Sequence, residues 1–136
     1  MNNEQKILVK YRMERAFESI EEAGILFENN HTNTYVNRLY YACFYAVNAL
    51  LLFKGLSSSK YSGIRSLFHQ NYIKSGIIKA DLGKLYDRLY DNRQKSDYAD
   101  MIRFNKEEVS EWISETKEFV NEIQKLINNF IKTRNK

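Results

Sequence analysis

The sequence predicts an all-α protein, an antiparallel four-helix up-and-down bundle with one additional short helix. Apolar residues recur at intervals of three and four along most of the chain, and no stretch alternates long enough to form a sheet strand. The 136 residues include no proline, so little forces a helix to stop. With 43% hydrophobic and 28% charged residues, the chain is expected to form one domain, residues 1–136, around a single core.

The first two predicted helices differ in polarity. The first, about residues 4–28, is amphipathic, with glutamates over much of its outer surface. Turn-forming and capping side chains follow at 29–33. The second helix lies within residues 36–55 and is apolar around most of its circumference, so it is expected at the centre of the bundle. Gly55 is its expected left-handed cap.

The second helix also bears on localisation. The single cysteine, Cys43, lies within its apolar stripe, which favours a core residue over a nucleophile or a ligand. One cysteine excludes a disulfide framework and fits a reducing cytoplasm. The longest apolar stretch, residues 40–53, is shorter than the roughly 18 residues of a membrane span. The N-terminal residues lack the pattern of a secretory signal, so we expect a cytoplasmic protein without a membrane anchor.

The third predicted segment, about residues 57–75, is short and basic. Between Lys54 and Lys84 there are six cations and one anion, Asp81, which gives a charge of +5 against +4 for the whole chain. The remainder of the chain therefore carries about −1. Such a segment could attract phosphate, or it could be a solvated surface that keeps the protein soluble.

The last two predicted helices complete the bundle. The fourth begins near Asp81, and its apolar stripe reaches Arg93, so a cation occupies an inward-facing position. It ends in the polar residues 96–100. The final helix begins after Asn105, an N-cap with Glu108 three residues on, and continues to about Ile131.

Metal and glycine-rich nucleotide motifs are missing from the sequence. His31 and His69 are far apart, Cys43 has no partner cysteine, and the five glycines form no phosphate-binding loop. We therefore expect neither a metal ion nor a cofactor.

Polar residues on inward-leaning positions form the first candidate site. They are Arg38, Tyr41 and Tyr45 on the second helix, and Arg93, Asp97 and Tyr98 at the end of the fourth. Arg93 and Asp97 are four residues apart and share a helix face. They either form a salt bridge that joins two helices, or hold the guanidinium toward a phosphate, with Tyr98 as an additional donor.

Arg65 and His69 form a second candidate site. Their spacing of four places a cation and a general base on one side of the third segment. The alternative is that His69 is a surface or packing residue.

Four segments of the chain, residues 38–46, 49–55, 62–69 and 89–98, resemble the HEPN family, small all-α domains named for nucleotide binding in higher eukaryotes and prokaryotes. The resemblance extends from about Arg15 to Ile127 and is to the short stand-alone bacterial and archaeal members. It implies a four-helix bundle that forms a homodimer. It also implies, as in many members, a toxin–antitoxin pair with a minimal nucleotidyltransferase.

The resemblance further implies two roles for the end of the fourth helix. Some HEPN proteins are metal-independent ribonucleases, with an arginine followed after four to six residues by a histidine, and the two protomers' motifs meet at the dimer interface. Arg93 matches the arginine, but Tyr98 stands where the histidine is expected, and a tyrosine with a pKa of about 10 is a poor base at neutral pH. In related toxins a nearby tyrosine receives adenylyl groups, which makes Tyr98 the residue to test for modification.

Three functional hypotheses follow from the sequence. The first is a dimeric module that binds nucleotide or RNA through Arg38, Arg93 and the tyrosines and acts with a nucleotidyltransferase. The second is a metal-independent ribonuclease toxin in which His69, from another helix or the second protomer, supplies the base. The third is a structural dimerisation domain whose polar cluster sets the helix register. We expect the dimer interface on the arginine-bearing face rather than on the charged first helix.

Overall fold

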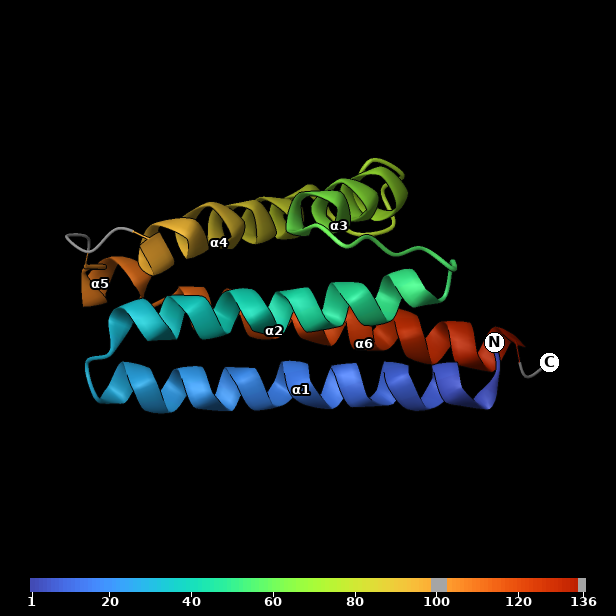
Figure 1. The fold of residues 1–136 in the computed structure, drawn as a ribbon, viewed down its shortest axis with the longest axis horizontal. Helices are drawn as coiled ribbons and strands as arrows, with labels where there is room; N and C mark the ends of the chain where they lie inside the picture. The colour runs from blue at the N-terminus through green and yellow to red at the C-terminus, as the bar shows by residue number, and fades with distance from the viewer. Residues whose placement is uncertain (99–102, 135–136) are drawn as a thin grey trace.

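The structure is a computed structural model that describes the backbone of residues 1–98 and 103–134 and the side chains of residues 1–95 and 103–133. Over these residues the protein is all-α, as predicted. The four long helices are α1 (Asn3–Glu28), α2 (Thr32–Leu52), α4 (Ala80–Tyr98) and α6 (Trp112–Arg134). They run alternately in opposite directions, which gives the predicted up-and-down bundle (Figure 1).

Helix α2 is the central element of the bundle. It lies between α1 and α4, with α6 packed behind it (Figure 1). Eleven of its 21 residues are buried. Cys43 is one of them and is 0% exposed, so this cysteine is a core residue as predicted. Burial raises the pKa of the Cys43 thiol, which therefore stays protonated. No helix in the described part of the chain is both long and apolar enough to cross a membrane.

The turns beside α2 follow their sequence signals. The α1–α2 turn contains Asn30 at a φ of 65°, a left-handed conformation that asparagine tolerates. Gly55 has a φ of 67°, and the N–H of Leu56 donates to the carbonyl of Leu51 at 3.1 Å, so Gly55 caps α2 as predicted.

The short third segment is less regular than predicted. It contains α3 (Tyr61–Phe68), which continues into the π-helical turn η1 (His69–Ile73). Gly76, with a φ of 81°, follows η1 at the predicted end of the segment. The segment lies against one half of α4 (Figure 1).

The C-terminal helix is divided, which corrects the prediction of one helix after Asn105. A short helix, α5 (Lys106–Val109), precedes α6. The hydroxyl of Tyr35 on α2 donates to the carbonyl of Val109 at 2.8 Å and accepts from the N–H of Ile113 at 3.1 Å. These two backbone groups would bond each other in a continuous helix, so the inserted tyrosine interrupts the ladder. Asn105 caps α5 as predicted, although its side chain accepts from the N–H of Glu107.

Candidate functional site

Arg93 is buried on the inward side of α4, as the sequence predicts. It is 6% exposed and follows the apolar stripe of that helix. Its guanidinium carbon lies 4.4 Å from the centroid of the Tyr61 ring and 5.2 Å from that of Tyr40. Cation–π attraction from two rings offsets part of the hydration that a buried guanidinium loses.

Tyrosines of α2 extend these contacts toward the surface. The hydroxyls of Tyr41 and Tyr61 are 3.4 Å apart, and the Arg38 guanidinium carbon lies 5.0 Å from the centre of the Tyr41 ring. The Tyr41 and Tyr45 rings are 6.4 Å apart between centroids. Farther along, the Arg15 guanidinium carbon of α1 lies 5.3 Å from the Tyr45 ring centre.

We call these residues together the arginine–tyrosine surface: Arg15, Arg38, Tyr41, Tyr45, Tyr61 and Arg93. They come from four helices and alternate cations with rings. Tyr41 and Tyr45 are half-buried, and Tyr61 is 39% exposed. The structure therefore brings the predicted residues Arg38, Tyr41, Tyr45 and Arg93 into one connected set.

Carboxylates of α1 partly balance the outer arginines. Arg15 donates to Glu18 at 2.7 Å, and Arg38 lies 4.0 Å from Glu22. The contacts with Tyr45 and with Glu18 raise the pKa of Arg15, so it remains a cation. Partly exposed ion pairs of this kind contribute about 0–1 kcal/mol, so an incoming phosphate can replace a glutamate at little cost.

Tyr41, at the surface, and Tyr40 beneath it are hydrogen-bond donors rather than bases. Burial, followed by the neighbouring Tyr61 hydroxyl, raises the pKa of Tyr41. Burial likewise raises the pKa of Tyr40 beneath it. Near neutral pH these hydroxyls keep their protons, and the surface offers cations, donors and ring faces.

The second predicted cluster lies farther along the contact between α3 and α4. His69 Nε2 is 2.8 Å from Asp87 Oδ1, so the imidazole donates to the carboxylate. Arg65 Nη1 is 3.9 Å from Asp87 Oδ1 and 3.7 Å from Asp91 Oδ1, and its guanidinium carbon is 4.0 Å from the Tyr90 ring centre. Arg65 and His69 therefore lie on one side of their segment, as predicted, and both contact Asp87.

The segment α3–η1 contacts α4 at four successive levels. From one end to the other the contacts are Tyr61 with Arg93, Arg65 with Tyr90 and Asp91, His69 with Asp87, and Ile73 with Gly83. A Cβ atom at Gly83 would lie 3.1 Å from Ile73 Cδ1 and 3.2 Å from His69 Cε1, so the glycine allows a close approach. Within one chain, the Arg65 contacts separate His69 from Arg93.

Two predicted site residues, Asp97 and Tyr98, lie at the end of α4, where the side chains are outside the described residues. The ion pair between Arg93 and Asp97 and the role of Tyr98 therefore stay predictions. Among the side chains that the structure describes, no three His, Cys, Asp or Glu residues are grouped so as to hold a metal ion.

Several contacting residues were not predicted. Tyr40 begins the apolar stretch of residues 40–53 and was expected only in the core, and Asp87 became relevant only through the register of α3 against α4. The sequence does hold one signal for Tyr61. It shares a four-residue spacing with Arg65 and His69, which places all three on one helix face.

Comparisons with known proteins place the chain in a family. The HEPN domain family matches residues 9–126. A UPF0332 protein of Thermotoga maritima is 41% identical over 125 residues, which cover 92% of this chain and 95% of that protein. A Methanocaldococcus jannaschii protein named "Putative toxin MJ0605" is 32% identical over 127 residues, which cover 93% of this chain and 94% of that protein. The chain belongs to the HEPN family.

Proposed function

We propose that this chain is a homodimeric module that binds nucleotide or RNA and acts with a nucleotidyltransferase partner in a toxin–antitoxin-type system. The observation that carries the proposal is the arginine–tyrosine surface. Single-stranded nucleic acids are bound by cations that meet the phosphates and by aromatic rings on which the bases stack. The surface offers both groups side by side.

The residues of the surface have different proposed roles, which follow from how exposed each side chain is. The ion pairs that Arg15 and Arg38 form with glutamates are partly exposed and weak, so these two guanidinium groups are placed to meet phosphates. Tyr41 and Tyr61 present partly exposed rings for stacking. Arg93 lies beneath Tyr61 and supports its ring position while adding positive charge to the site.

The toxin-type role is supported by two relatives. The alignments with the two Methanocaldococcus jannaschii proteins named putative toxins cover 93% and 85% of this chain. The homodimer and the nucleotidyltransferase partner rest on the family resemblance. Tyr98 is the residue that we would test for adenylylation by such a partner.

A metal-independent ribonuclease is the second candidate, and the His69–Asp87 contact favours it. The carboxylate accepts from Nε2, which orients the imidazole and leaves Nδ1 as an acceptor for a proton. Because Arg65 separates His69 from Arg93 within one chain, a second protomer would have to bring these residues together. If this candidate is correct, His69→Ala should no longer cleave RNA. A His69→Ala variant that cleaves RNA as well as wild type does would rule out His69 as the base.

The first experiment measures binding and cleavage of a labelled structured RNA in EDTA by wild type, Arg93→Ala and Arg93→Lys. We expect wild type to bind, Arg93→Ala to keep its helical circular dichroism but lose binding, and Arg93→Lys to retain part of it. Cleavage that disappears in Arg93→Ala would establish the ribonuclease.

Two outcomes would favour a purely structural domain instead. The first is a global loss of helicity in Arg93→Ala. The second is a wild-type melting temperature that neither nucleotides nor RNA raise, because a ligand that binds only the native state must stabilise it.

A further inference from the structure

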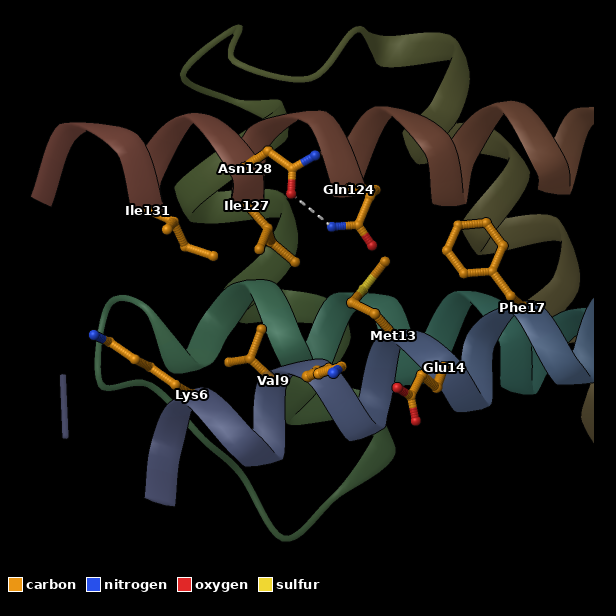
Figure 2. A pocket seen from close by; sticks show the side chains of 10 residues that line it. Lys6, Val9, Met13, Glu14, Phe17, Gln124, Ile127, Asn128 and Ile131 are labelled. Atoms are coloured by element: carbon orange, nitrogen blue, oxygen red, sulfur yellow. Dashed lines mark hydrogen bonds between the residues drawn. The ribbon is translucent and has the colours of Figure 1, made fainter. Parts of the chain in front are cut away.

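A groove of about 440 Å³ follows the contact between α1 and α6. Val9, Met13 and Phe17 line it from α1, and Ile127 and Ile131 line it from α6 (Figure 2). These α1 positions recur every four residues, whereas Arg15 lies two residues from both Met13 and Phe17. Because residues two apart point to opposite sides of a helix, the groove and the arginine–tyrosine surface occupy opposite sides of α1.

The outer rim of the groove combines charged and apolar side chains. Lys6, Lys10 and Glu14 line it from α1. Phe17, which also lines the groove, is 39% exposed, and Ile7, on the neighbouring outer face of α1, is 69% exposed, although both are large apolar residues. Among the described side chains, neither Lys10 nor Glu14 forms an ion pair.

The outer face of α1 has the spacing of a helix-pairing stripe. Its positions alternate intervals of four and three residues: Asn3, Ile7, Lys10, Glu14, Phe17 and Glu21. This stripe is distinct from the buried one that packs α1 into the bundle, which includes Val9, Met13 and Ala16. The charges of the stripe also change sign along the helix, because Lys10 is followed by Glu14 and Glu21.

We propose that this face binds a second copy of the chain, with the two α1 helices antiparallel about a twofold axis near Arg12. In this register Lys10 faces Glu14 of the second copy, and Ile7 faces its Phe17. A twofold axis repeats each contact, so two lysine–glutamate pairs and two apolar pairs form together. The apolar groove beside the stripe receives the facing helix.

The charges select this register over its neighbours. An antiparallel pairing shifted by one helical turn places either Lys10 against Lys10 or Glu14 against Glu14 of the second copy. Like charges that face each other across the interface repel, so both shifted registers are disfavoured. Exposed ion pairs contribute little energy and are screened by salt, so the apolar pairs stabilise the contact and the charges specify it.

The interface is independent of the proposed RNA-binding function, because it lies on the other side of α1 from the arginine–tyrosine surface. It is also distinct from the homodimer interface expected on the arginine-bearing face. A chain that uses both interfaces forms an assembly larger than a dimer, and one that uses the α1 interface alone forms a dimer. In either case, loss of the α1 interface lowers the mass of the assembly.

Sedimentation velocity on the purified full chain tests the proposal by charge reversal. Wild type, Lys10→Glu, Glu14→Lys and the double variant Lys10→Glu/Glu14→Lys are compared over a concentration series. Each single reversal should weaken the association by about tenfold or more, and the double reversal should restore it. Lys84→Glu, a reversal on an exposed position of α4, should leave the association unchanged.

Three results would overturn the proposal. Wild type could be monomeric throughout the series, the single reversals could assemble as wild type does, or the double variant could fail to recover the assembly. Lys10 and Glu14 are exposed, so circular dichroism should show all variants folded.

Discussion

Tyr35 and Tyr41 lie six residues apart on α2 in opposite environments. Tyr35 is fully buried, and its hydroxyl is bonded to the carbonyl of Val109 and the N–H of Ile113. Tyr41 is half-buried, and its hydroxyl and ring contact Tyr61 and Arg38. Bonds to backbone groups of other helices therefore make Tyr35 part of the architecture. A tyrosine among arginines at the surface remains accessible to a ligand.

The largest expected effect is a loss of folding stability at alkaline pH, caused by the buried Tyr35. Burial raises the pKa of Tyr35 to about 12, against about 10 in the unfolded chain. Above pH 10 the unfolded chain binds fewer protons than the folded protein, so stability is complete below about pH 10 and falls as the pH rises through 12. The loss from Tyr35 alone approaches about 2.7 kcal/mol.

Urea unfolding between pH 8 and pH 12, followed by circular dichroism and tyrosinate absorbance, measures this loss. A Tyr35→Phe variant serves as the control and should show a shallower decline. A stability that stays constant up to pH 12 would contradict the buried environment of Tyr35.

The same substitution should destabilise the protein more at Tyr35 than at Tyr41. Tyr35→Phe leaves the buried carbonyl of Val109 and N–H of Ile113 without their hydroxyl partner, which should cost about 1–3 kcal/mol. Tyr41→Phe removes a partly exposed hydroxyl and should cost less than about 0.5 kcal/mol. Urea unfolding at neutral pH measures both values, and equal losses would refute the distinction between the two environments.

A smaller effect is expected from Gly83→Ala, far from Tyr61 along the contact between α3 and α4. The added methyl group would crowd Ile73 and His69, whereas alanine gains up to about 1 kcal/mol in helix propensity. The two effects should nearly cancel in stability, while the ring of His69 moves relative to Asp87. The NMR signals of that ring should shift, and unchanged signals would contradict the close approach of η1 to α4.

Periodicity was sufficient to predict the four long helices, because each buries an apolar stripe, and Gly55 marked the end of α2. The break between α5 and α6 could not be predicted. It depends on the Tyr35 hydroxyl, which comes from another helix and reaches Val109 across 74 residues of sequence. Local spacing contains no information about such an insertion.

In the candidate site, too, local spacing predicted which residues face inward or share a helix face, but not their contacts with other helices. The apolar stripe of α4 placed Arg93 inward, and a spacing of four placed Arg65 beside His69. The rings above Arg93 and the carboxylate of Asp87 depend on how α3 is aligned against α4. That alignment is a tertiary property, set in part by the close approach at Gly83.

The role of the arginine–tyrosine surface is tested by the RNA affinity of Tyr41→Ala beside that of Tyr35→Phe, measured by fluorescence anisotropy with a labelled single-stranded RNA. We expect Tyr41→Ala to bind about tenfold or more weakly while it is folded, because a stacking ring is lost. Tyr35→Phe should bind as wild type does while it is folded, although it is less stable. Wild-type affinity in Tyr41→Ala would contradict the central claim that the arginine–tyrosine surface binds nucleic acid.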